Sequence, residues 1–215
     1  MKKKIVTLAL VIALLAIVVA GASLAYFTDT QSAENVFTMG NVDIELDEPD
    51  WTDPTNPIGE GAKPGIEYPK DPYIKNVGDT DAWVRMKVEI SDYSVLKAAA
   101  DKYGVDLLDM FADLAPADWE VKTGDQPVVD TANDTITYTY YYTTIMAPED
   151  ETSRLFTSVT IPAQFTQEDL EDLGTDDEGK LKFTITVSAD AIQEADAFTT
   201  VYDAFDAFDG AAENP

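Results

Sequence analysis

Apolar and charged side chains alternate along the segment VRMKVEI, residues 84–90. Side chains two positions apart share one face of a β-strand, so this alternation predicts a half-buried strand with a charged outer face. The same period of two appears in VDIEL, residues 42–46, and β-branched and aromatic residues dominate 135–146. Two further strands are expected over 154–161 and 181–189. Because turn residues separate these runs, we expect a mainly β fold, a jelly roll or β-sandwich of antiparallel strands.

Helical patterns interrupt the strands at a few places. Segments 93–103 and 106–114 are each expected to form a helix, and Thr166 with Asp169 resembles a capping box that opens a short one. Residues 50–72, rich in proline, are expected to be an irregular excursion. Near the C-terminus, aromatic residues three or four positions apart predict a helix docked on the sandwich, with a partner-binding helix as the alternative. These residues are Phe198, Tyr202, Phe205 and Phe208.

The composition excludes several classes of function. The chain has 215 residues, enough for one domain of ordinary size, and its 45% hydrophobic content can supply a core. With 14 Lys+Arg against 41 Asp+Glu, the net charge is −27, which repels nucleic acid and anionic lipid. There is no cysteine and no histidine. The sequence therefore lacks disulfides, thiolate sites, the usual general base near neutral pH and the commonest zinc ligand.

The first residues have the pattern of an export signal. Three lysines precede an apolar run over residues 5–20, and small residues follow it. Ser23 and Ala25 suit the −3 and −1 pockets of a signal peptidase, which places the cut before Tyr26. We expect residues 1–25 to be a signal peptide and the remainder to be secreted and unanchored, meeting the membrane only before cleavage. An uncleaved membrane anchor is the alternative.

No catalytic motif is present, and we predict no catalytic residue. With so many acids, close carboxylate pairs arise by chance and carry little information. Two oxygen-rich loops suit calcium, a hard cation, although neither has EF-hand spacing. Their acidic residues are Asp47, Glu48, Asp50 and Asp53 in the first loop, and Asp176, Asp177 and Glu178 in the second. Calcium is therefore the one cofactor considered, and solvated acidic loops are the alternative.

The aromatic residues admit two interpretations. Tyr138, Tyr140 and Tyr142 share one face of a predicted strand, with Tyr141 on the other. They predict core packing and cross-strand pairing, and the alternative is a platform for carbohydrate stacking. Trp83 has the same two interpretations, because it lies on the polar face of its strand.

The start of the expected secreted chain resembles a known family. YFTD at 26–29 and NVFTMGNVDI at 35–44 resemble the N-terminal pattern of the TasA/camelysin family of Gram-positive bacteria. IKNVG at 74–78, leading to AWVR at 82–85, and ADAIQ at 189–193 extend the resemblance to the middle and the end of the chain. The N-terminal match is the specific one.

The resemblance implies a jelly roll, a signal peptide of the SipW-dependent type and a role in biofilm matrix or at the cell surface. Fibre-forming members of that family assemble head to tail, each N-terminal strand completing the next subunit's sheet. It also implies a donor segment at 26–40 before a domain at 41–215, with a second copy as partner and a minor fibre or anchoring protein as a further one. The donor side chains would be Tyr26, Phe27, Val36 and Phe37.

Three alternatives remain open beside this interpretation. The N-terminal segment can instead fold back onto its own sheet. The family also carries a metallo-endopeptidase label, but the sequence has no His-Glu-x-x-His motif and no histidine, so no catalytic residue transfers to it. A secreted carbohydrate- or ligand-binding module is the third class, and it depends only on the aromatic residues.

Overall fold

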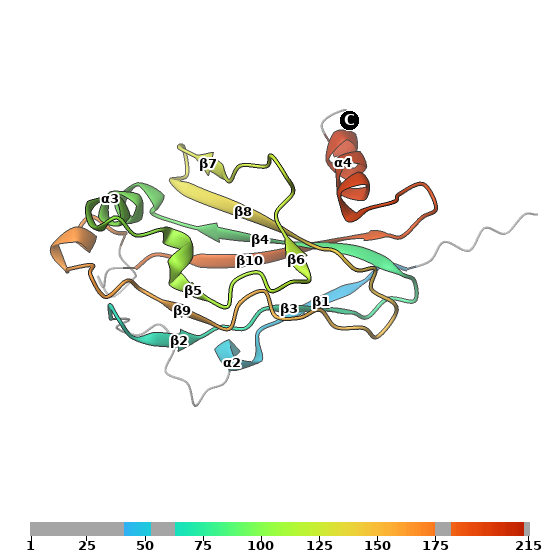
Figure 1. Cartoon of the computed structure of the whole chain (residues 1–215), viewed down its shortest axis with the longest axis horizontal. Helices are drawn as coiled ribbons and strands as arrows, with labels where there is room; N and C mark the ends of the chain where they lie inside the picture. Colours follow the sequence, from blue (N-terminus) through green and yellow to red (C-terminus); the bar gives the residue numbers. More distant parts are fainter. Residues whose placement is uncertain (1–40, 53–62, 175–181, 213–215) are drawn as a thin grey trace, which may run out of the picture. The chain divides into compact units, whose positions relative to one another are not determined.

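A computed structural model describes residues 41–52, 63–174 and 182–212, which belong to one compact unit running from Gly40 to Pro215. Figure 1 shows that they form mainly β-structure with a few short helices. The strands are β1 (Ile44–Asp47), β2 (Glu67–Pro69), β3 (Tyr73–Asn76), β4 (Ala82–Ile90), β5 (Phe111–Ala112), β6 (Trp119–Glu120), β7 (Val128–Asp130), β8 (Thr135–Tyr142), β9 (Ser158–Thr160) and β10 (Ile185–Gln193). The helices are α2 (Pro49–Thr52), α3 (Tyr93–Tyr103) and α4 (Val201–Ala212), with 3-10 turns η1 (Leu107–Met110) and η2 (Glu168–Leu170).

The strands form three antiparallel sheets. The largest has the order β10-β4-β8-β6, and β7 also pairs with β8. β4 lies inside it, with Ile90 opposite Ile185 of β10 and Ile136 of β8. A second sheet has the order β2-β9-β5, and β1 pairs with β3. The mainly β prediction is confirmed, whereas the jelly-roll connectivity stays a prediction.

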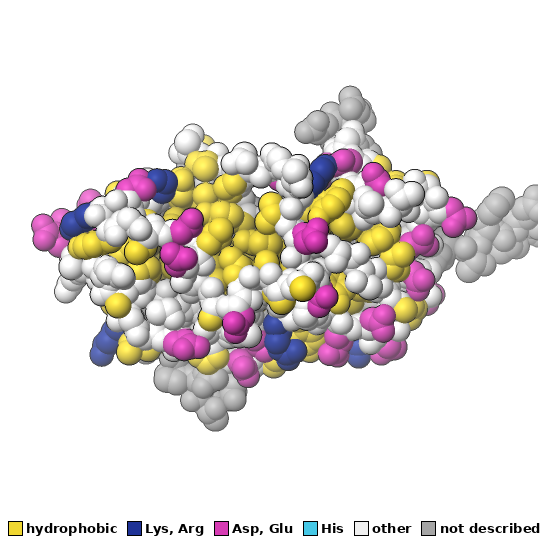
Figure 2. Space-filling view, in the orientation of Figure 1, with side chains coloured by type: hydrophobic (Ala, Val, Ile, Leu, Met, Phe, Trp, Pro, Cys, Tyr) yellow, Lys and Arg dark blue, Asp and Glu magenta, His cyan; other side chains and the backbone are white. Residues whose placement is uncertain are grey.

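The outer surface reflects the acidic composition. Figure 2 shows acidic side chains spread over one face of the molecule, with few basic ones between them. Several of the basic side chains are bound to carboxylates, as in the pair of Lys97 with Asp101 on one face of α3. Little positive charge is left to balance the acids, which bears on how two copies approach one another.

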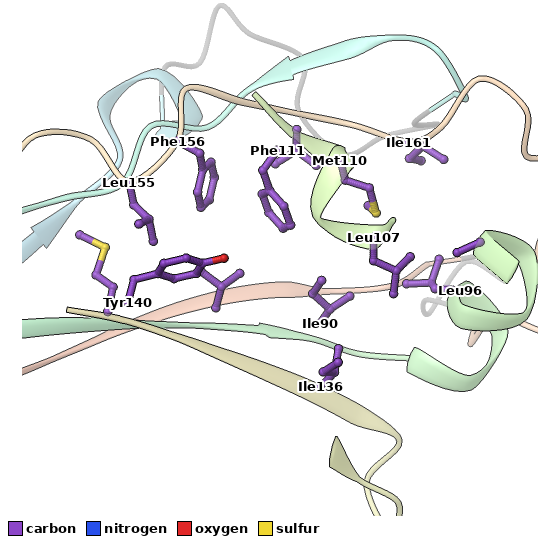
Figure 3. Close-up of a cluster of buried hydrophobic side chains, with 14 of the residues drawn as sticks. Ile90, Leu96, Leu107, Met110, Phe111, Ile136, Tyr140, Leu155, Phe156 and Ile161 are labelled. Atoms are coloured by element: carbon purple, nitrogen blue, oxygen red, sulfur yellow. The ribbon is translucent and has the colours of Figure 1, made fainter. Parts of the chain in front are cut away.

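The core lies between the large sheet and the β2-β9-β5 sheet. Figure 3 shows Ile90, Ile136 and Tyr140 of the large sheet facing Phe111 and Phe156 from the opposite layer. The rings of Phe111 and Phe156 lie 4.8 Å apart, centroid to centroid. Packing of two apolar sheet faces is what the period of two in the sequence predicted.

Helix α4 packs on the other face of the large sheet. Trp83 of β4 and Tyr141 of β8 form a separate apolar cluster with Val201, Ala204 and Phe205 of α4. The prediction of a docked C-terminal helix is therefore confirmed.

Other local predictions have mixed outcomes. The helix expected over 93–103 is confirmed as α3, and Thr166 and Asp169 form the expected reciprocal bonds before η2, with Thr166 N donating to Asp169 Oδ2 at 2.8 Å. The helix expected over 106–114 is wrong. Asp106 caps only the single turn η1, and the backbone that follows pairs with β9 as β5.

Two strand boundaries also differ from expectation. Of the strand expected over 154–161, only β9 forms. Before β9, Leu155 N donates to Pro72 O of a loop rather than to a strand. The strand expected over 181–189 begins at Ile185 and extends to Gln193, because β4 offers a partner for its whole length.

Candidate functional site

Strand β10 forms an edge of the large sheet. It pairs with β4 on one side, and no other described strand pairs with it. With nine residues it is much longer than the other strands that have an open side, which have two to four residues each. A long open edge is a template for an added strand.

The alternating hydrogen bonds between β10 and β4 determine which backbone groups of β10 face away from β4. Ser91 N donates to Thr184 O at 3.0 Å, and beyond the other end of β10 Glu194 N donates to Asp81 O at 2.8 Å. Residues of an antiparallel pair alternate between bonding the partner strand and facing away from it. The even-numbered residues of β10 therefore bond β4. The residues that direct their backbone N–H and C=O away from β4 include Ile185, Val187, Ala189 and Ala191.

The side chains of these outward-bonding residues are apolar. They pack against the main core but are only half-buried, while Thr186 and Ser188 on the opposite face are exposed. No hydrogen bond links their outward backbone groups to another part of the described chain. An additional strand here would satisfy backbone groups and bury apolar side chains together.

A second feature lies where the chain enters the domain. Val77 N donates to Asp43 O at 3.0 Å, and Asp79 N donates to Asn41 O at 3.1 Å. These bonds continue the β1–β3 register, in which Ile44 is opposite Asn76. The backbone is therefore in line with β1 as far back as Asn41. We call residues 41–43 together with 77–79 the root ladder.

The root ladder depends on a close approach at Gly78. A Cβ there would lie 2.3 Å from Asn41 O and 2.8 Å from Asp43 N, so no larger residue fits without a shift. The buried side chain of Asn76 holds the turn, because its Oδ1 accepts from Gly78 N and its Nδ2 donates to Thr80 O and Met146 O. The residues of the IKNVG segment thus have a structural role that spacing alone did not predict.

Arg85 of β4 links α4 to the outer face of the large sheet through ion pairs. Its side chain is 3% exposed, its Nε donates to Asp190 at 2.7 Å, and its two terminal nitrogens bind Asp209 of α4 at 2.7 and 2.8 Å. The guanidinium also lies 4.3 Å from the ring centroid of Phe205. The bonds from Arg85 lower the pKa of the Asp209 carboxyl, so this pair stays charged well into the acid range.

The aromatic residues proposed for carbohydrate stacking are largely covered. Trp83 and Tyr141 are each 5% exposed beneath α4, and Tyr140 is buried in the main core. Trp83 lies on the same face of β4 as Arg85, and α4 covers that face, so Trp83 packs against the helix. The core-packing interpretation of the tyrosines fits this burial.

Within the described residues, the acidic side chains proposed as calcium ligands do not form a common site. Both carboxylate oxygens of Glu48 accept from the buried ammonium of Lys70, at 2.7 and 2.8 Å, while Asp47 accepts from Tyr73 Oη at 3.3 Å. Asp50 N donates to Asp71 Oδ1 at 2.9 Å. Within 41–52, 63–174 and 182–212, no group of three or more acids is placed to hold a metal ion. The remaining calcium candidates lie outside the described residues. They are Asp53, Asp176, Asp177 and Glu178.

The export and donor predictions concern residues outside the described ranges. The peptidase positions are Ser23, Ala25 and Tyr26, and the donor side chains are Tyr26, Phe27, Val36 and Phe37. None of the helices in the described part of the chain has the length and apolar character needed to cross a bilayer.

Comparison with known proteins identifies one family. The family model described as camelysin metallo-endopeptidase matches residues 1–191, which include the root ladder and most of β10 but not α4. A search of curated proteins finds no match.

Proposed function

The chain belongs to the camelysin metallo-endopeptidase family, and from this premise we propose that it is a secreted structural subunit of extracellular-matrix or cell-surface fibres. Subunits join head to tail when the N-terminal segment of one copy, residues 26–40, adds as a strand to the sheet of the next. A minor fibre or anchoring protein is the further partner considered. Removal of residues 1–25 by signal peptidase during export would make Tyr26 the first residue of the donor.

The open edge of β10 is the observation that carries this proposal. Its outward backbone groups and half-buried apolar side chains provide what β-augmentation requires, main-chain bonds for affinity and side-chain contacts for specificity. Nine residues of strand extend about 30 Å at roughly 3.3 Å per residue, and the donor segment is long enough to cover them. Tyr26, Phe27, Val36 and Phe37 would supply the apolar contacts.

Charge sets the conditions for assembly. Copies that each carry a large negative charge repel one another, and salt screens that repulsion over about 10 Å at 0.1 M ionic strength. We therefore expect assembly to be favoured by high salt, by divalent cations such as calcium and by low pH. Calcium need not occupy a defined site to have this effect.

The family description also names a metal-dependent peptidase. Catalytic zinc sites use imidazole or thiolate ligands, and this chain has neither histidine nor cysteine. The carboxylate of Glu48, one of the acids considered as a ligand, is bound to Lys70. The described residues thus do not fit a catalytic zinc centre, and we assign no catalytic step. Chelator-sensitive cleavage of a protein substrate by purified protein would restore this alternative.

Electron microscopy tests the structural role. Negatively stained chain from Tyr26 to Pro215 would be compared with the same chain lacking Tyr26 to Met39, at low and high salt, with and without calcium. The deletion leaves the compact unit intact, which a thermal melt would verify. We expect filaments from the longer chain only. Monodisperse particles under every condition would overturn the proposal, and filaments of equal width from the shorter chain would overturn donation by this segment.

A further inference from the structure

The side of β8 that faces away from β4 is covered in two separate places. The start of β8 pairs with β7 at Thr137, and its end pairs with β6 at Tyr141. No strand of the described residues pairs with Thr139, which lies between these two points. Figure 1 shows the loop of residues 121–127, which joins β6 to β7, turning away from β8. The row of strands beside β8 therefore has a gap at Thr139.

The backbone of Thr139 faces this gap. Just beyond β6 and β8, Thr143 N donates to Asp118 O at 2.9 Å. Because successive residues of an antiparallel strand bond to opposite sides, the odd-numbered residues of β8 direct their N–H and C=O away from β4. Thr137 and Tyr141 meet β7 and β6 on that side, whereas neither group of Thr139 bonds another described residue. One donor and one acceptor of the backbone are thus left open at the gap.

A groove with a volume of about 550 Å³ lies at this gap, and we call it the β8 groove. Lys87 and Thr139, which are opposite one another on β4 and β8, line it on the outer face of the large sheet. Residues 124–128 form a wall, and α4 contributes Asp209. Tyr138, whose side chain packs against the main core, also lines the groove, so the groove reaches through the gap. Its volume is in the range of small-ligand sites.

Part of the lining of the β8 groove is apolar and open to solvent. Val121 is 50% exposed and Val128 is 66% exposed, and Pro127 lies beside Val128 in the same wall. Figure 2 shows hydrophobic side chains gathered on the surface between β7 and β6. A wall of this kind packs against the carbon skeleton of a ligand.

The charged side chains of the β8 groove balance one another. Arg85 and Lys87 carry one positive charge each, and Asp125 and Asp209 carry one negative charge each. A ligand with a net charge would meet a like charge within the groove, whichever its sign. An anion would in addition be repelled by the net charge of −27 on the whole chain. The groove therefore favours a neutral ligand.

The polar groups of the β8 groove include both donors and acceptors. The Lys87 ammonium has three N–H donors, and its side chain is 37% exposed although it pairs with Asp190. The Asp209 side chain is 52% exposed, so its carboxylate can accept bonds beyond those from Arg85. Thr139 adds its backbone N–H and C=O. Because a hydroxyl group both donates and accepts, a ring with several hydroxyls can satisfy all of these groups together.

We propose that the β8 groove binds a neutral saccharide. Its hydroxyl groups bond Lys87, Asp209 and the backbone of Thr139, and its C–H face packs against Val121 and Val128. This site differs from an aromatic stacking platform, because its exposed apolar wall consists of aliphatic side chains. The inference goes beyond the proposed function and does not depend on fibre assembly. Because α4 follows the last residue matched by the family model, the complete groove includes a part of this chain outside that match.

Calorimetric titration tests the class of ligand. The chain from Tyr26 to Pro215, kept at low salt, would be titrated with maltotriose, cellotriose and chitotriose, which are neutral, and with the anionic trigalacturonate. We expect saturable binding of at least one neutral trisaccharide and no binding of trigalacturonate. If none of the neutral trisaccharides binds, or if trigalacturonate binds more tightly than they do, the inference is overturned.

Two substitutions test the lining, each with a matched control. Lys87→Met removes the ammonium donors at similar side-chain length and should weaken binding about tenfold. Val128→Asp places a charge in the apolar wall and should weaken binding at least as much. The controls are Lys97→Met, which removes the same charge from α3, and Val129→Asp, one residue further along β7. Both controls should bind like the unaltered chain, and a melting curve for each variant verifies folding. Equal weakening in a variant and its control would overturn the inference.

The amide of Thr139 gives a readout at the gap itself. Its N–H is unpaired, so its hydrogen exchange should be faster than that of Thr137, which is opposite a residue of β7. A bound trisaccharide should slow exchange at Thr139 and shift its amide resonance, with little change at Thr137. Binding that leaves the Thr139 resonance unchanged would place the saccharide elsewhere and overturn the inference. Filaments formed by a chain that binds no saccharide would overturn this inference alone, while the fibre role stands.

Discussion

Proline substitution on β10 separates the role of its edge from the stability of its sheet. Ala189 directs its backbone N–H away from β4, so Ala189→Pro removes a donor that bonds no other backbone group among the described residues. Its neighbour Ser188 directs its N–H towards β4, and Ser188→Pro removes a bond of the ladder. The two changes introduce the same ring one residue apart in the same strand, so each serves as the control for the other.

The expected effects on folding differ by several-fold. Edge strands accept proline where its missing N–H would face away from the sheet, so Ala189→Pro should lower the free energy of unfolding by no more than about 1 kcal/mol. Ser188→Pro removes a hydrogen bond that contributes about 1 kcal/mol to stability. It also leaves the acceptor on β4 without a partner, which costs about 1–3 kcal/mol more. We therefore expect Ser188→Pro to cost about 2–4 kcal/mol, measured by urea unfolding.

The expected effects on assembly are the reverse. A donor strand on β10 would accept a bond from Ala189 N, and the proline ring would occupy the space of its carbonyl. Loss of that bond and displacement of the strand should weaken the association free energy of each junction by about 2 kcal/mol. The protein concentration needed for filaments should therefore rise roughly thirtyfold. Sedimentation of filaments across a concentration series measures this threshold.

Two results would refute the reasoning. If the Ala189→Pro chain assembles at the same concentration as the unaltered chain, β10 is not the acceptor edge. If Ser188→Pro is no less stable than Ala189→Pro, the assignment of inward and outward backbone groups is wrong.

Three further predictions follow from the described contacts. Gly78→Ala brings a Cβ within 2.3 Å of a root-ladder oxygen, so it should cost about 1–3 kcal/mol in urea unfolding, while Gly210→Ala, with no atom within 4 Å of its Cβ, should cost nothing. Phe205→Ala should weaken α4 docking by about 3 kcal/mol, seen as a red shift of tryptophan emission at urea concentrations where the unaltered chain keeps its spectrum. Arg85 lowers the pKa of Asp209 in the folded chain, so the stabilisation from this pair is complete above the unfolded pKa of about 3.9. It is lost as the pH falls through the lower folded value, and an Asp209→Asn chain should show a weaker loss in an acid titration followed by tryptophan emission.

Elements with a strong local signal were predictable from the sequence. The alternation over 84–90 and the residue types of 135–146 correspond to β4 and β8, and the boundaries of α3 agree with expectation. The aromatic stripe near the C-terminus predicted a docked helix. The family resemblance rested on residues near the N-terminus, and the match over 1–191 confirms it.

Other features depend on contacts between distant segments. The backbone after Asp106 is helical for one turn only, because β9 offers Phe111 a strand partner that no local pattern reveals. The charged face of β4 appears solvated from its sequence, but α4 covers Arg85 and supplies Asp209 to neutralise it. In each case a segment remote in sequence overrides the local preference.

The sequence by itself determined the period of the strands, the acidity of the surface and the lack of imidazole and thiol chemistry, because these depend only on residue type and local spacing. Tertiary structure alone decided that β10 lies at the edge of the large sheet, with no further strand of the described residues paired to it, and that residues 41–43 bond the turn after β3. Strand order and chain direction arise from pairing between segments far apart in sequence, such as β10 with β4 and the root ladder with the turn after β3. The period of two that marks a strand is the same whether the strand lies inside a sheet or at its edge.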